Sequence, residues 1–123
     1  MRAIDLAIEF SLRDGSKLSL LYVLALPAVG LSEEGLEALK KAGESALDEA
    51  DSKCLSSGLK TSKILKIVEN SSTAYEIDKV AVEGRYDCVI LGSRGYAGMR
   101  GILMGSVGVS LAISLPCTTI IVR

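Results

Sequence analysis

The residues best suited to chemistry lie in one short segment, Ile90–Gly108, which reads ILGSRGYAGMRGILMGSVG. It holds six of the chain's 12 glycines, and a glycine leaves its backbone N–H bare for close approach by another group. Arg94 and Arg100 add positive charge, and Ser106 offers a hydroxyl at the predicted start of a helix. Bare N–H groups at the amino end of a helix attract anions. The segment therefore predicts a site that holds phosphate groups.

Two familiar phosphate-binding motifs do not occur in this segment. The GxxxxGK[ST] loop needs a lysine, which the segment lacks, and the GxGxxG pattern of dinucleotide-binding folds is absent as well. In a structural alternative, the glycines only make a tight connection between a strand and a helix. Spacing alone leaves both interpretations open.

The composition limits which catalytic, metal-binding and nucleic-acid-binding functions are expected. Histidine, the commonest general base and metal ligand, is absent, and the three cysteines lack metal-binding spacing. We therefore predict no metal site and no catalytic residue. A net charge of −1 creates no field that recruits nucleic acid. The 15 acidic residues all lie at or before Asp87, so the glycine-rich segment and the rest of the chain after it contain no acid.

Two features bear on location. The 22 residues Gly101–Val122 carry no charge and are long enough to span a bilayer, but they contain Gly, Ser, Thr and Pro and divide into a helix, a turn and a strand. Membrane insertion is therefore disfavoured. The odd number of cysteines and a charged, non-signal beginning predict a cytoplasmic protein.

Helical and strand-like patterns alternate along the whole chain. Amphipathic segments predict helices at 3–14, 32–54, from Thr73 and at 106–115, and apolar runs predict strands at 17–26, 61–68, 86–93 and 117–123. Such alternation is typical of a parallel sheet with right-handed crossovers and helices on both faces. We expect one α/β domain, a doubly wound parallel sheet, over residues 1–123.

Several stretches together resemble the universal stress protein family. The spacing Gly92-x2-Gly95-x9-Gly105-Ser106 is similar to the G-2x-G-9x-G-[ST] signature of the ATP-binding branch of that family. The stretches YDCVILGSRG, GSV and LPCTTIIVR resemble the family's strand, helix start and terminal strand, and SLRDGSKLSLLYVL resembles its first helix and second strand. The similarity covers nearly the whole chain.

The resemblance implies a flavodoxin-like fold of the adenine nucleotide alpha hydrolase-like type, with strand order 3-2-1-4-5. It also implies a homodimer formed through the edge strand Thr118–Val122, and ATP, with Mg²⁺, as the ligand. Such a protein would act as a nucleotide-responsive stress regulator and at most as a slow ATPase. By position, the binding residues would be Gly92, Gly95, Gly105 and Ser106 for the phosphates, Val23 and Leu91 for adenine and ribose, and Val107 in the helix that follows. Arg94 is a further phosphate candidate, or else a solvated surface residue.

One departure from the family is large. Members begin with a central strand ending in an aspartate that reaches the nucleotide, whereas this sequence starts with the helix that follows. An empty central position leaves unpaired backbone groups that cost about 1–3 kcal/mol each, so it must be filled or closed. The strand is missing from this sequence, a partner chain donates it, or strands Lys17–Leu26 and Asp87–Gly92 pair directly. An alternative function follows: an interaction module of this fold without a nucleotide site, with the apolar last helix as its partner surface.

Overall fold

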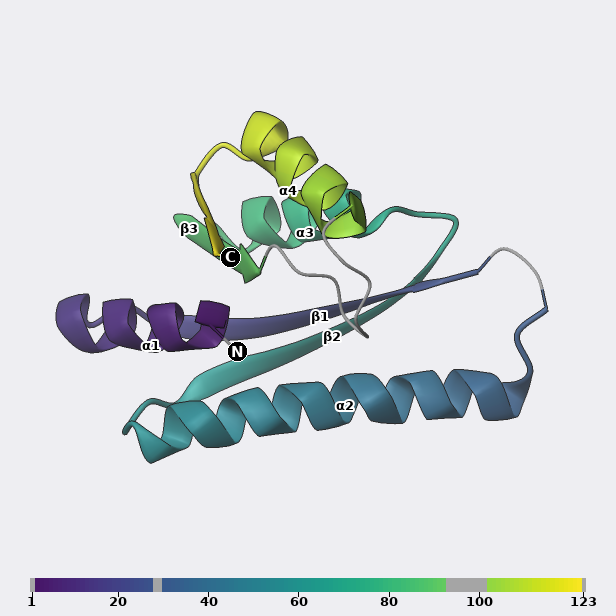
Figure 1. Cartoon of the computed structure of the whole chain (residues 1–123), viewed down its shortest axis with the longest axis horizontal. Coiled ribbons are helices and arrows are strands. Elements are labelled where there is room, and N and C mark those ends of the chain that lie inside the picture. Colours follow the sequence, from purple (N-terminus) through teal and green to yellow (C-terminus); the bar gives the residue numbers. More distant parts are fainter. Residues whose placement is uncertain (1, 28–29, 93–101, 123) are drawn as a thin grey trace. The chain divides into compact units, whose positions relative to one another are not determined.

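The computed structural model describes residues 2–27, 30–92 and 102–122, in which helices and strands alternate as the sequence predicts (Figure 1). The elements are α1 (Arg2–Asp14), β1 (Leu18–Leu26), α2 (Glu33–Ser56), β2 (Thr61–Glu69), α3 (Thr73–Glu83), β3 (Cys88–Gly92), α4 (Ile102–Ser114) and β4 (Thr118–Val122).

Two helix boundaries differ from the prediction. The last helix, α4, begins at Ile102 and not at Ser106, because the residues Ile-Leu-Met that come first are good or tolerated helix formers. Helix α2 continues two residues past Cys54 and ends where Gly58 adopts a left-handed conformation (φ 83°). There the N–H of Gly58 donates to the carbonyl of Leu55, which closes the helix.

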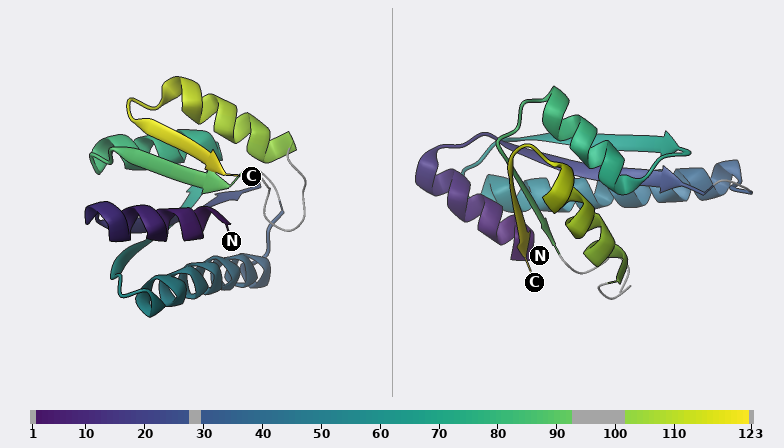
Figure 2. Two further views of the ribbon diagram at one scale, coloured as in Figure 1. Left: turned by 60° about the vertical axis from the view of Figure 1, so that its left-hand side comes forward. Right: turned by 90° about the horizontal axis from the view of Figure 1, so that it is seen from above.

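The chain forms two compact units. One is Ile8–Thr73, and the other combines Met1–Ala7 with Ala74–Arg123. That residues 1–123 make one domain stays a prediction. In the first unit β1 and β2 pair in parallel, from Leu18 opposite Thr61 to Leu26 opposite Glu69. In the second, β3 and β4 run side by side in the same direction, as Figure 2 shows, with Cys88 opposite Thr118. Direct pairing of β1 with β3, considered above, stays a prediction.

Helix α2 packs on one face of the β1–β2 sheet. A side chain at Gly43 would come within 3.0 Å of the Tyr22 ring and 3.1 Å of Leu65 Cδ1, so a glycine lets helix and sheet approach closely. The helix buries Leu47, Ala50 and Cys54, the last completely. Burial raises the pKa of the Cys54 thiol, with a smaller contribution from Asp51. This face forms the apolar core of the unit.

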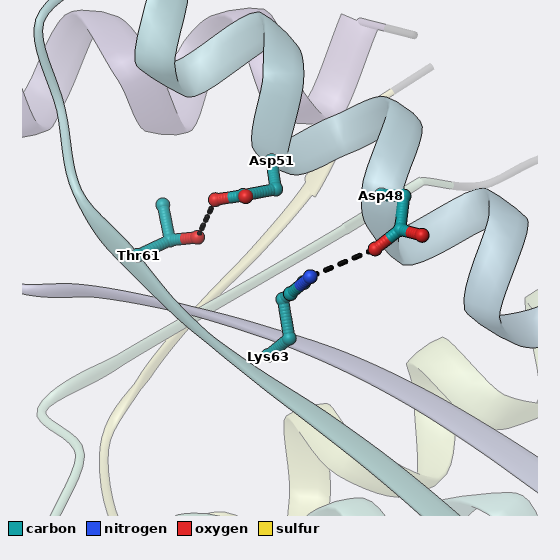
Figure 3. A network of polar contacts seen from close by, with 4 residues as sticks. All are labelled: Asp48, Asp51, Thr61 and Lys63. Atoms are coloured by element: carbon teal, nitrogen blue, oxygen red, sulfur yellow. Dashed lines mark hydrogen bonds and ion pairs between the residues drawn. The ribbon is translucent and has the colours of Figure 1, made fainter.

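A short polar network joins the second half of α2 to the start of β2 (Figure 3). Thr61 Oγ1 donates to Asp51 Oδ1 at 2.6 Å in a half-buried position, and Lys63 Nζ contacts Asp48 Oδ1 at 2.7 Å at the surface. The hydrogen bond to Asp48 raises the pKa of Lys63. Positions three apart on a helix meet positions two apart on a strand, so the network holds α2 in register with the sheet.

We expect Asp51→Ala to lower the free energy of unfolding by about 1 kcal/mol, because the Thr61 hydroxyl loses a charged, half-buried acceptor. Asp48→Ala removes only an exposed ion pair and should have a smaller effect. Urea unfolding followed by circular dichroism measures both variants. Equal effects would show that burial does not distinguish the two contacts.

Candidate phosphate-binding site

The candidate site is built on β3 and α4. Strand β3 ends at Gly92 and α4 begins at Ile102, and α4 returns the chain to β4, which is parallel to β3. In parallel sheets, ligands bind beyond the carboxyl ends of the strands. The end of β3 and the first turn of α4 are therefore the described borders of the predicted phosphate site.

A buried cluster fixes α4 in this unit. Leu111 is fully buried and packs with Leu115 and with Ala81 of α3. Two of the predicted site residues, Leu91 and Val107, pack against the same cluster. The structure thus brings both residues to one apolar cluster, which contacts β3 near its end and α4 in its second turn.

Packing explains one glycine of this unit but not another. At Gly108, a Cβ would lie 2.9 Å from Ile121 Cδ1, so packing of α4 on β4 accounts for the glycine. At Gly92, a Cβ would have no described neighbour within 4 Å, and no left-handed backbone is recorded there. Neither packing nor conformation of the described residues explains a glycine at the end of β3. A bare backbone there is what a ligand that approaches closely requires.

The first turn of α4 supplies free donors. The first four N–H groups of a helix, from the N-cap to its third residue, have no backbone partner within it, and those in the described part of α4 belong to residues 102–104. Gly105 is the fourth residue of α4, so the helix accounts for its N–H, as it does for Leu36 at the same position of α2, which donates to the Ser32 carbonyl. Ser106, expected at the helix start, is the fifth residue of α4, so the helix accounts for its N–H. The first turn has no acidic residue, which leaves the positive end of the helix dipole available to an anion.

The remaining predicted residues lie in the other unit or outside the described residues, so their place in the site stays a prediction. Arg94 and Gly95 lie outside the described residues. Val23 lies half-buried in β1, in the unit Ile8–Thr73. Among the residues that the structure describes, no group of three or more His, Cys, Asp or Glu side chains is arranged to hold a metal ion. In the same residues, every helix is too short or too polar to cross a membrane.

The sequence analysis did not find a second hollow, in the unit Ile8–Thr73. This β1–β2 hollow has a volume of about 240 Å³, lies at the carboxyl ends of β1 and β2, and is lined by residues that include Leu26, Pro27, Leu31, Leu36, Glu69 and Asn70. The available signal was the polar pair Glu69–Asn70 directly after a strand, the usual place for ligand-binding groups in parallel sheets.

Comparison with known proteins places the fold. A profile of the universal stress protein family matches residues 1–123. Universal stress protein YxiE of Bacillus subtilis (strain 168) is 27% identical over 135 residues, which cover 99% of this chain and 89% of that protein. The structure of universal stress protein UspA from Lactobacillus plantarum matches with a TM-score of 0.83 and 19% identity, over 99% of this chain and 88% of that one. The structure of the universal stress protein from Archaeoglobus fulgidus in complex with dAMP matches with a TM-score of 0.70 and 18% identity, over 99% and 86%. The flavodoxin-like α/β fold with parallel strands is thereby confirmed.

We expect Leu111→Ala to lower the free energy of unfolding by about 3 kcal/mol, because it opens a cavity under α4 in a fully buried position. Ile113→Ala is the matched control: it lies two residues away on the same helix, its residue is 81% exposed, and its effect should be below about 0.5 kcal/mol. Urea unfolding measures both. Similar costs for the two variants would contradict the cluster as the anchor of α4.

Proposed function

The chain belongs to the universal stress protein family, and on this premise we propose that it binds an adenine nucleotide, ATP with Mg²⁺, through the segment Gly92–Ser106. The observation that carries the proposal is Gly92, whose missing side chain nothing among the described residues explains. The free N–H groups in the first turn of α4 and the absence of acids there support an anionic ligand. The similar protein from Archaeoglobus fulgidus was solved with dAMP, an adenine nucleotide.

In this proposal the glycines leave room for phosphate oxygens against the backbone. Gly92 ends β3 and Gly95 follows it in sequence, and the free N–H groups of residues 102–104 donate to the phosphates while Gly105 adds no side chain beside them. Ser106 adds its hydroxyl, and Arg94 adds positive charge. Leu91 and Val107 contribute apolar surface beside them. Mg²⁺ usually keeps several waters and is held largely by the phosphates themselves, so it needs no cage of carboxylates.

We assign the protein a regulatory role, as a cytoplasmic sensor of the adenine nucleotide in the stress response. A hydrolase needs a group that activates water, and the chain has no histidine for that task. Binding and slow release of the nucleotide would then set the state of the protein, with at most slow hydrolysis by positioning alone.

Calorimetric titration of the nucleotide-stripped protein with Mg-ATP tests the proposal. We expect saturable binding that Gly105→Val weakens by about tenfold or more, since a loss of roughly 1.4 kcal/mol of phosphate contact has that effect. Gly92→Val tests the other border of the site in the same way. Ser110→Val adds similar bulk at an exposed position of α4 and should leave binding unchanged. Absence of binding by the well-folded unaltered protein would overturn the proposal.

A second candidate function rests on a different observation. Val109 and Ile113, one turn apart on α4, are exposed, and the helix carries no charged residue. An apolar face of this kind is typical of a surface that binds another protein. In this candidate the chain is an interaction module without a nucleotide. Failure to bind Mg-ATP in the titration above favours it.

We further propose a homodimer formed by antiparallel pairing of β4 with β4 of a second copy. Among the described residues β4 pairs only with β3, and its sequence TTIIV contains no charge to discourage pairing. The N–H of Thr118 donates to the carbonyl of Asp87 beside β3. Because N–H groups alternate along a strand, those of Thr119 and Ile121 point to the open edge.

We expect Thr119→Pro to convert the dimer into a monomer while the protein stays folded, because it removes a donor from the open edge only. Ile120→Pro is the contrasting variant, since it removes a donor directed toward β3 and should destabilise the fold. Sedimentation velocity gives the oligomeric state, and circular dichroism reports folding. A folded Thr119→Pro variant that remains dimeric would place the interface elsewhere.

A further inference from the structure

The β1–β2 hollow has a construction of its own, independent of the phosphate site. Leu26 and Glu69 stand opposite each other at the ends of the two strands. Each lies four residues beyond a residue that contacts Gly43 of α2, namely Tyr22 and Leu65. Side chains alternate along a strand, so Leu26 and Glu69 share the face that α2 covers. The beginning of α2 lies at the same end of this unit (Figure 1).

The lining combines an apolar wall with two polar groups. Leu26, Leu31 and Leu36 supply aliphatic surface, and Leu31, which lies beside Gly35, remains 38% exposed, so a ligand could bury more of it. Glu69 and Asn70 supply a carboxylate and an amide. Among the described residues, neither side chain has a hydrogen-bonded or ionic partner. Both are therefore available to a ligand.

The charges around the hollow determine whether it favours a cationic or an anionic ligand. Glu33 and Glu34 occupy the first turn of α2, close in sequence to the leucines of the wall. The nearest lysine along α2, Lys40, is 3.8 Å from Glu37, which offsets part of its charge. On β2, Lys63 contacts Asp48, and Lys66 lies on the opposite face by alternation. An acidic hollow repels phosphates and favours a cation.

We propose that the β1–β2 hollow binds a small aliphatic primary amine. The hydrocarbon body packs against the leucines, and the ammonium group donates hydrogen bonds to the Glu69 carboxylate and the Asn70 side-chain oxygen. A volume of about 240 Å³ falls below the range of pockets for drug-sized ligands, so the ligand is a small metabolite. The proposal does not depend on nucleotide binding at the glycine segment.

Three ligands with one carbon skeleton test the proposal on the full chain without nucleotide: isoamylamine, isoamyl alcohol and isovalerate. The amide signals of ¹⁵N-labelled protein report binding. We expect saturable shifts at Leu26, Gly30 and Asn70 with the amine. The alcohol should bind about tenfold more weakly because its hydrogen bond carries no charge, and the carboxylate should not bind because Glu69 repels it. Equal responses to all three ligands, or amine-induced shifts confined to other residues, would overturn the proposal.

Glu69→Gln keeps the size of the side chain and removes its charge, so it should weaken amine binding about tenfold. Glu44→Gln is the matched control, an exposed glutamate on α2 outside the hollow, and should leave the affinity unchanged. Because Glu69 is exposed at a strand end, both variants are expected to fold, which circular dichroism checks. Unaltered amine affinity in folded Glu69→Gln would contradict the assigned role of this carboxylate. Nucleotide titrations of the same variants separate this proposal from the one for the glycine segment.

Discussion

Parallel pairing of β1 with β2 and of β3 with β4 requires a helix to carry the chain back between the strands of each pair. In each unit this brings the carboxyl ends of both strands to one edge and the amino end of the connecting helix to the same place. Both candidate sites follow from that arrangement: the glycine segment after β3, and the β1–β2 hollow beside the start of α2.

The two edges differ in charge, and this difference separates their chemistry. The first turn of α4 has no acidic residue, whereas α2 begins with Glu33 and Glu34. The same helix-start geometry therefore offers bare positive N–H groups to an anion in one unit and is screened by carboxylates in the other. We therefore expect a phosphate ligand only at the first edge and an ammonium ligand only at the second.

Much of the fold was predictable because apolar periodicity sets element type directly. The nearly continuous apolar run of β1 and the alternation in β2 both appear where expected. The start of α4 was not predictable, because Ser106 is a good capping residue and no capping signal marked the earlier start at Ile102. The β1–β2 hollow was missed because it depends on the register that sets Leu26 opposite Glu69, which no local pattern contains.

The central claim is that the backbone between β3 and α4 holds the phosphates of an adenine nucleotide. The most direct measurement is the set of amide chemical-shift changes in ¹⁵N-labelled protein on addition of Mg-ATP, with adenosine as the phosphate-free comparison. The account predicts large changes at Gly92 and at residues 102–106 with Mg-ATP that adenosine does not reproduce. Equal changes with both ligands at these residues, or none with Mg-ATP, would contradict it.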